Sequence, residues 1–103
     1  MDAQNSPTSR LEVFAEILAN DKHLDCHSQR RRLVKALEQL GTVTTFEAMR
    51  KLDIYDPTAR KAELLKLGYD IICVKRKVQT ESGEWHKVGH YTLVGFSTKG
   101  IQQ

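Results

Sequence analysis

The fold of this chain is decided by residues 41–69, which read GTVTTFEAMRKLDIYDPTARKAELLKLGY. Thr44 followed three residues later by Glu47 is a capping box, which predicts the start of a short helix. The Asp56-Pro57 pair predicts the start of another helix, because aspartate is a favoured N-cap and proline fits the first helical position. This helix is expected to span residues 56–67 and to end at the glycine that follows.

A short turn around Asp53 and Ile54 separates these two expected helices. Two helices joined by such a turn form a helix-turn-helix, in which the turn often contains glycine. Aspartate at position 53 is a mild departure, because it tolerates unusual backbone angles better than most residues. The segment is therefore interpreted as a helix-turn-helix.

Two more helices are predicted before this segment. Ser28 is a good N-cap for a helix that ends at Gly41. Ser9 and Glu12 form a second capping box, which starts a helix that ends near Asn20. Apolar residues at helical spacing support both: Leu11, Phe14, Ile17 and Leu18 in the first, and Leu33, Ala36, Leu37 and Leu40 in the second. A short strand is expected at Thr42-Val43-Thr44.

After Gly68 the apolar residues alternate instead of following a helical period. This change predicts strands at 69–79 and 85–94 joined by a tight turn at 81–84. The hairpin is rich in basic residues, so it predicts a positively charged arm that follows the helices.

A two-residue loop at Ser82-Gly83 would set the register of this hairpin. Ile72 then lies opposite Leu93. Val74 lies opposite Tyr91 on the same face, which is expected to face the core. The opposite face would carry Lys75, Lys77, His86 and His90, while Arg76 and Lys87 would lie near the tip on the first face.

Three helices followed by a basic β-hairpin are the element order of an α+β winged helix-turn-helix, a three-helix core with a C-terminal β-hairpin wing. Residues 29–94 resemble a family of small helix-turn-helix domains common in phages and prophages, whose members are generally taken to bind DNA. The matching features are Gln29, Gly41-Thr42-Val43-Thr44-Thr45, Glu47-Ala48, Leu52-Asp53-Ile54, Ala59-Arg60, Glu63-Leu64 and Lys66-Leu67-Gly68-Tyr69-Asp70-Ile71. The family commonly has glycine in place of Asp53 and an aliphatic residue in place of Lys61.

The length of 103 residues fits one domain. We expect a disordered N-terminus (1–8), an N-terminal helix and connector (9–27), the winged helix-turn-helix domain (28–95) and a flexible tail (96–103). The N-terminus does not resemble a signal peptide and no apolar run could cross a bilayer, so a cytoplasmic or nucleoid-associated protein is expected. Residues 1–27 have two Lys or Arg against five Asp or Glu, whereas residues 28–103 have fourteen against eight.

This excess of positive charge in the domain favours a polyanion, and double-stranded DNA is the expected partner. Helix 56–67 would enter the major groove, and the hairpin 70–94 would act as the wing. The residues expected to contact DNA are Thr58, Arg60 and Lys61 in the helix, Lys75, Arg76, Lys77 and Lys87 in the wing, and Arg30 and Arg31 beside them.

Each of these assignments has an alternative that the sequence leaves open. Arg60 has Glu63 three residues further on, so it is equally well placed for an ion pair within its helix. The wing cations could instead protect a sheet edge from pairing with other chains. The cluster Arg30-Arg31-Arg32 could simply be solvated, although cations near a helix start are unfavourable unless an anion compensates them.

Neither catalysis nor a cofactor nor a small-molecule ligand is indicated. The sequence contains no glycine-rich phosphate loop, no nucleophile elbow and no convincing carboxylate pair, so an enzyme is not expected. His23, Cys26 and His27 have ligand-type side chains, but no paired Cys or His motif offers a fourth ligand for zinc, and a surface connector is favoured.

Two further questions stay open at this level. The apolar face of the N-terminal helix could cover the domain of its own chain or pair with a second copy in a homodimer. The same fold also serves elsewhere as a protein-interaction module, so a host or phage protein is the alternative partner.

Overall fold

The structure is a computed structural model that describes residues 9–96. The expected disordered segment 1–8 and all but the first residue of the expected tail lie outside the described residues. The elements are α1 (Arg10–Asn20), α2 (Cys26–Leu40), β1 (Thr42–Thr44), α3 (Thr45–Lys51), α4 (Pro57–Lys66), β2 (Tyr69–Gln79) and β3 (Trp85–Phe96). The three strands form an antiparallel sheet in the order β1-β3-β2, so the predicted α+β winged helix-turn-helix is confirmed.

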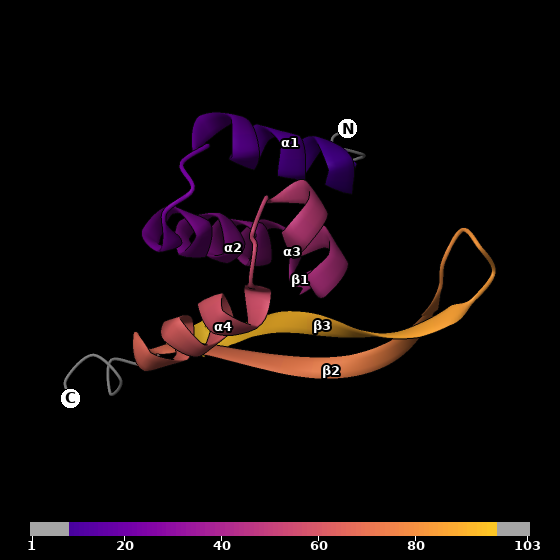
Figure 1. Ribbon diagram of the computed structural model, residues 1–103. Helices are drawn as coiled ribbons and strands as arrows, with labels where there is room; N and C mark the ends of the chain where they lie inside the picture. The colour runs from indigo at the N-terminus through magenta and orange to yellow at the C-terminus, as the bar shows by residue number, and fades with distance from the viewer. Residues whose placement is uncertain (1–8, 97–103) are drawn as a thin grey trace, which may run out of the picture.

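The helices lie above the sheet in Figure 1, with α1 stacked on α2 and α4 in front of the hairpin. The hairpin of β2 and β3 extends beyond the helices, and its tip bends upward on the side of α3. A single cluster of buried side chains joins the elements: Phe14, Ile17, Leu33, Leu37, Val43, Leu52, Ile54, Leu64, Ile71 and Tyr91 are among its members.

Helix α1 is part of this core. Phe14 and Ile17 are buried in the same cluster as residues of α2 and of the sheet. The Arg10 guanidinium donates to both carboxylate oxygens of Glu47 at 2.8 and 3.1 Å and to the Thr42 carbonyl at 2.8 Å. The N-terminal helix could have covered the domain of its own chain or paired with a second copy. In the structure its apolar face packs on the domain of its own chain.

Helix α2 begins earlier than the sequence predicts. Its N-cap is Asp25, whose carboxylate accepts from the Ser28 amide at 3.1 Å and from the Ser28 hydroxyl at 2.8 Å. Ser28 was the predicted cap, but both residues favour that position, and a cap at Asp25 leaves Ser28 in the first turn as its partner. The basic cluster therefore lies one turn further into the helix than expected.

Arg32 is the most deeply buried charged residue among the described ones, with no exposed surface. Its guanidinium donates to the Asp21 and His23 carbonyls of the α1–α2 connector at 2.8 and 2.6 Å. It also donates to the Leu52 and Asp53 carbonyls of the helix-turn-helix turn at 2.7 and 3.2 Å. Arg32 thus joins two irregular segments whose carbonyls have no helix or strand to satisfy them.

The turn between α3 and α4 lies at Asp53, where the sequence predicts it. Asp53 has a φ of 54°, the left-handed region in which glycine is commoner and aspartate is tolerated. The capping box of Thr44 and Glu47 is formed at the start of α3, and Asp56 accepts from the Ala59 amide at the start of α4.

The predicted register of the hairpin is wrong by one residue. Cys73 lies opposite Tyr91 and Ile71 opposite Leu93, so these residues face the core. Ile72 and Val74, which were expected to face it, are instead 50% and 44% exposed.

The loop length explains the shift. The Thr80 amide donates to the Glu84 carbonyl and the Gly83 amide to the Thr80 carbonyl, which leaves three residues in the loop rather than two. Gly83 has a φ of 90°, as expected for the last position of a three-residue hairpin loop. The register shifts again by one residue between Asp70 and Ile71, so that Tyr69 pairs with Phe96 at the end of the hairpin.

Candidate nucleic-acid interface

The outward face of α4 follows the spacing i, i+3, i+4, i+7. Thr58, Ala62 and Leu65 on this face are exposed, and Lys61 is half-buried. The opposite side of the helix packs inward through Leu64, which belongs to the core. Residues at this spacing lie on one side of a helix, so these four side chains form the surface that α4 offers to a partner.

A groove of about 260 Å³ lies between α4 and the hairpin. Lys61 of α4 lines it together with Lys75 of β2 and Lys87 of β3, and no carboxylate is among its lining residues. The hydroxyl-bearing residues Thr45, Thr58 and Tyr91 complete its polar surface. Three ammonium groups and several hydroxyl groups around one groove suit the binding of an anion. Cys73 and Gly89 complete the eight residues that line it, and we call this site the lysine groove.

The three-residue loop places these lysines together. In the observed register Lys75 lies opposite Gly89 and Lys77 opposite Lys87, so all three lysines of the hairpin lie on the face toward α4. The prediction that separated Lys87 from Lys75 and Lys77 is therefore wrong. Like charges directly opposite each other destabilise a strand pair, so the pairing of Lys77 with Lys87 favours an external anion.

Gly89 lets α3 approach the hairpin at the floor of the groove. A β-carbon at this position would lie 3.0 Å from the Cys73 sulfur and 3.2 Å from the Thr45 methyl. Both distances are tighter than ordinary contact. The absence of a side chain here keeps the start of α3 close to β3.

Burial raises the pKa of the Tyr91 phenol, and the Thr58 hydroxyl beside it only partly opposes that effect. The phenol therefore stays protonated at neutral pH. It lines the lysine groove as a hydrogen-bond donor rather than as a negative charge.

Arg60 does not share the outward face with Thr58 and Lys61. Its guanidinium forms a bidentate pair with Glu63 at 2.8 and 2.9 Å, and it lies 3.4 Å from the Gln29 amide oxygen of α2. Hydrogen bonding to Arg60 and then to Arg30 lowers the pKa of Glu63. The ion pair between Arg60 and Glu63, which was one of two alternatives from the sequence, is therefore formed. Arg60 would have to break this pair to contact DNA.

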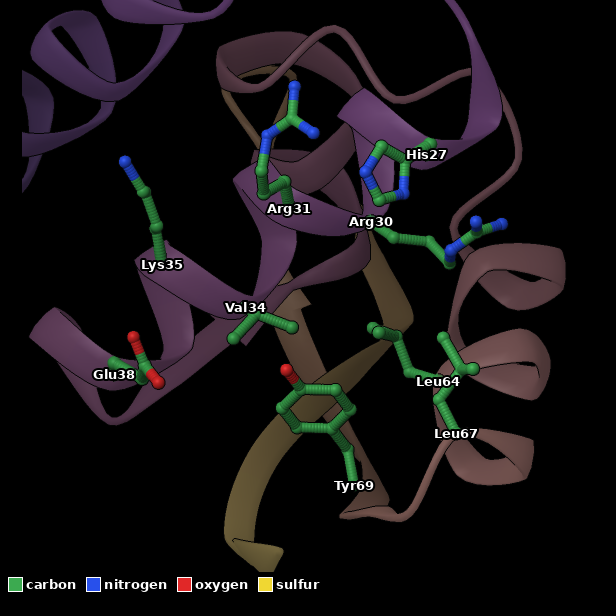
Figure 2. Close-up of a pocket in the computed structure, with 9 residues that line it drawn as sticks. All are labelled: His27, Arg30, Arg31, Val34, Lys35, Glu38, Leu64, Leu67 and Tyr69. Atoms are coloured by element: carbon green, nitrogen blue, oxygen red, sulfur yellow. The ribbon is translucent and has the colours of Figure 1, made fainter. Parts of the chain in front are cut away.

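Arg30 and Arg31 lie away from the lysine groove. Arg30 reaches from α2 to Glu63 of α4 at 2.8 Å, and Arg31 pairs with Asp21 of the connector at 2.7 Å. Figure 2 shows both beside a second groove of about 290 Å³, on the other side of α4, with an apolar floor. This second groove is lined by His27, Arg30, Arg31, Val34, Lys35, Glu38, Leu64, Leu67 and Tyr69.

The anion that the basic cluster was expected to need is supplied within the chain. Glu63 and Asp21 compensate Arg30 and Arg31, and four carbonyls surround Arg32. Hydrogen bonding to Arg31 lowers the pKa of Asp21.

Arg76 is on the other face of the hairpin. It lies opposite Val88, and it shares that face with His86 and His90 rather than with the lysines. The wing is therefore basic on both faces, as expected, but its two faces carry different residues from those predicted.

The sequence alone did not single out three exposed residues near this surface. Tyr55, which precedes α4, is 92% exposed, and Ala62 and Leu65 lie on the outward face. The helical period could have found the last two, because they follow Thr58 by four and seven residues while Leu64 faces the core.

Neither a metal site nor a membrane-spanning helix is found within residues 9–96. No group of three or more His, Cys, Asp or Glu side chains in this range could hold a metal ion. No helix in the same range combines the length and the apolar character needed to cross a membrane.

Comparison with known proteins agrees with this geometry. The family model of the winged helix-turn-helix domain matches residues 28–95, which include α3, α4, β2 and all of β3 except Phe96. Searches of curated proteins and of solved structures returned no match. Since the match covers about two-thirds of the chain, from α2 to the end of the sheet, this protein belongs to the winged helix-turn-helix domain family.

Proposed function

We propose that this protein binds double-stranded DNA, with α4 in the major groove and the β2–β3 hairpin as a wing on the adjacent backbone. The observation that carries the proposal is the lysine groove. Lys61, Lys75 and Lys87 come from three different elements and converge on the groove between α4 and the hairpin.

The physical basis is release of counterions from DNA. Each phosphate that a lysine neutralises releases condensed cations, which drives binding and makes it depend on salt. Thr58 is the second residue of α4. It would contact base edges or phosphates near the N-terminus of the helix, where recognition helices of helix-turn-helix proteins contact DNA. Lys77 extends this positive surface toward the tip of the wing, and Arg76 adds a positive charge on the other face of the hairpin.

Arg30, Arg31 and Arg60 take a lesser part in this proposal. All three are bonded to carboxylates of the same chain. A phosphate contact by any of them would break an ion pair with Glu63 or Asp21, so the lysines provide the main contacts.

The test is fluorescence anisotropy with mixed-sequence duplex DNA at several salt concentrations. We expect the affinity to fall steeply with salt, and the slope of log K against log salt to decrease by about 2 in the K75A/K87A variant. The matched control is K22A/K35A, which removes the same charge from the α1–α2 connector and from α2, where Lys35 lines the second groove (Figure 2). This control should keep the slope nearly unchanged, apart from a small loss of general attraction.

The absence of salt-dependent binding, or an equal loss in both variants, would overturn the proposal. Binding to a protein would then be the function to test, and the second groove beside Arg30 and Arg31 would be the surface to probe first.

The biological role that we propose is that of a regulator of the phage or prophage type. Its support is the resemblance of residues 29–94 to helix-turn-helix domains common in phages. A binding site selected from random duplexes that recurs in phage or prophage promoters would support this role, and its absence there would argue against it.

A further inference from the structure

We propose that α4 recognises thymine methyl groups in the major groove, through Ala62 and Leu65. This inference rests on the proposed DNA-binding function and names the base feature that the same site reads. It concerns specificity, whereas the lysine groove provides affinity that does not depend on sequence.

The first observation is that Arg60, the side chain of α4 best suited to read a base, is bonded to Glu63 of the same helix. Arginine is the commonest reader of guanine, through a bidentate contact to its O6 and N7. Arg60 instead makes its bidentate contact with Glu63, and its side chain is only 11% exposed. Asparagine and glutamine, which read adenine, do not occur in α4.

The second observation is what remains on the outward face. Thr58, Lys61, Ala62 and Leu65 follow the spacing i, i+3, i+4, i+7, and this is the spacing by which homeodomain recognition helices reach bases. Two of these four side chains are apolar, and the methyl of Thr58 adds a third apolar group. Leu65 is 42% exposed among charged neighbours, so a partner that covers it gains by removing it from water.

Thymine is the base with a chemical group that matches this face. Its C5-methyl projects into the major groove, where alanine and the methyl group of threonine contact it. The distance from Thr58 to Leu65 along the helix axis is about 10 Å, so the face spans roughly three base-pair steps. We therefore expect sites in which two or more thymines lie close together in the groove.

The experiment replaces thymine by uracil, which has the same hydrogen-bonding groups but lacks the methyl. A duplex is first selected from a random pool, and its affinity is then measured with thymine and with uracil at each contacted position. For the natural protein we expect a loss of about fourfold for each methyl that α4 covers.

Two variants make the result specific to this face of α4. Leu65→Ala should reduce the ratio between thymine and uracil duplexes toward one at the affected position. Leu67→Ala is the matched control, because Leu67 is 45% exposed but lines the second groove on the other side of the helix (Figure 2). It should leave the ratio as in the natural protein.

Equal affinity of the natural protein for thymine and uracil duplexes would overturn this inference. An unchanged ratio in Leu65→Ala would overturn the assignment to Leu65. Either result, obtained with salt-dependent binding to the unmodified duplex, would leave the proposed function standing. Failure of all duplexes to bind at low salt would instead reject the proposed function itself.

Discussion

At the scale of single residues, several arginines have structural roles that could not be predicted from the residues next to them in the sequence. The run Arg30-Arg31-Arg32 looks like a cationic patch, yet each member bonds to acceptors within the chain. Arg32 differs most from the expectation, because carbonyls rather than a carboxylate surround it.

Replacing Arg32 by leucine should destabilise the fold by about 3 kcal/mol or more, because four carbonyls would lose a charged donor and some would stay buried without a partner. Urea denaturation of the variant measures the change. Arg31→Leu is the control, since Arg31 is 43% exposed, and its effect should be clearly smaller. Equal effects of the two changes would contradict the role given to Arg32.

The pairing of Glu63 with Arg60 and Arg30 should make stability depend on pH. These hydrogen bonds lower the pKa of Glu63 below its ordinary value of 4.5. A carboxyl with a lowered pKa stabilises the fold above its ordinary value, and that contribution is lost as the pH falls through the lowered pKa. The difference in unfolding midpoint between the natural protein and Glu63→Gln should therefore be largest above the ordinary pKa of 4.5 and shrink as the pH falls below it. A difference that does not vary with pH would contradict the lowered pKa of Glu63.

At the scale of elements, the contact between α3 and the hairpin depends on close approach at one position of β3. A side chain at position 89 would meet both the Cys73 sulfur and the Thr45 methyl. Position 95 on the same strand is different, because a β-carbon there would have only the Asp70 carboxylate within 4 Å, at 3.9 Å.

Gly89→Ala should therefore destabilise the fold by about 1–3 kcal/mol, the usual cost of overpacking. It should also weaken DNA binding, since it displaces the floor of the lysine groove. Gly95→Ala is the matched control and should affect neither property strongly. Thermal unfolding and anisotropy measure both effects, and a Gly89→Ala variant that matches Gly95→Ala in each would refute the argument.

At the scale of the whole molecule, positive charge gathers at a groove that no carboxylate of the described residues lines. The lysine groove contains three lysines without a lining carboxylate, and Lys77 lies opposite Lys87. Arg30 and Arg31 of α2 and Arg60 of α4, in contrast, are paired with Asp21 or Glu63.

Lys87→Ala should accordingly raise the melting temperature slightly at low salt while it weakens DNA binding. The gain should disappear at high salt, because salt screens the repulsion between exposed lysines in the natural protein. Lys22→Ala, in the α1–α2 connector and not among the residues that line the groove, should show no such gain. A melting temperature of Lys87→Ala that equals the natural value at every salt concentration would contradict the proposed repulsion.

Local signals in the sequence determined most of the fold. The two capping boxes, the Asp56-Pro57 start and the turn at Asp53 depend on residues that are neighbours in the chain, and each occurs where predicted. The alternation after Gly68 likewise located both strands, since it reflects a surface with two different faces.

The tertiary structure decided what depends on contacts between distant residues. The register of the hairpin followed from a three-residue loop, and a shift of one residue moved Lys87 to the same face as Lys75 and Lys77. Arg60 had a local partner that the sequence could name, but only the packing of α2 on α4 turns it inward and leaves Ala62 and Leu65 on the open face. The sequence by itself thus determined which elements form, because helix caps and strand alternation are local, while the tertiary structure determined which side chains share a surface.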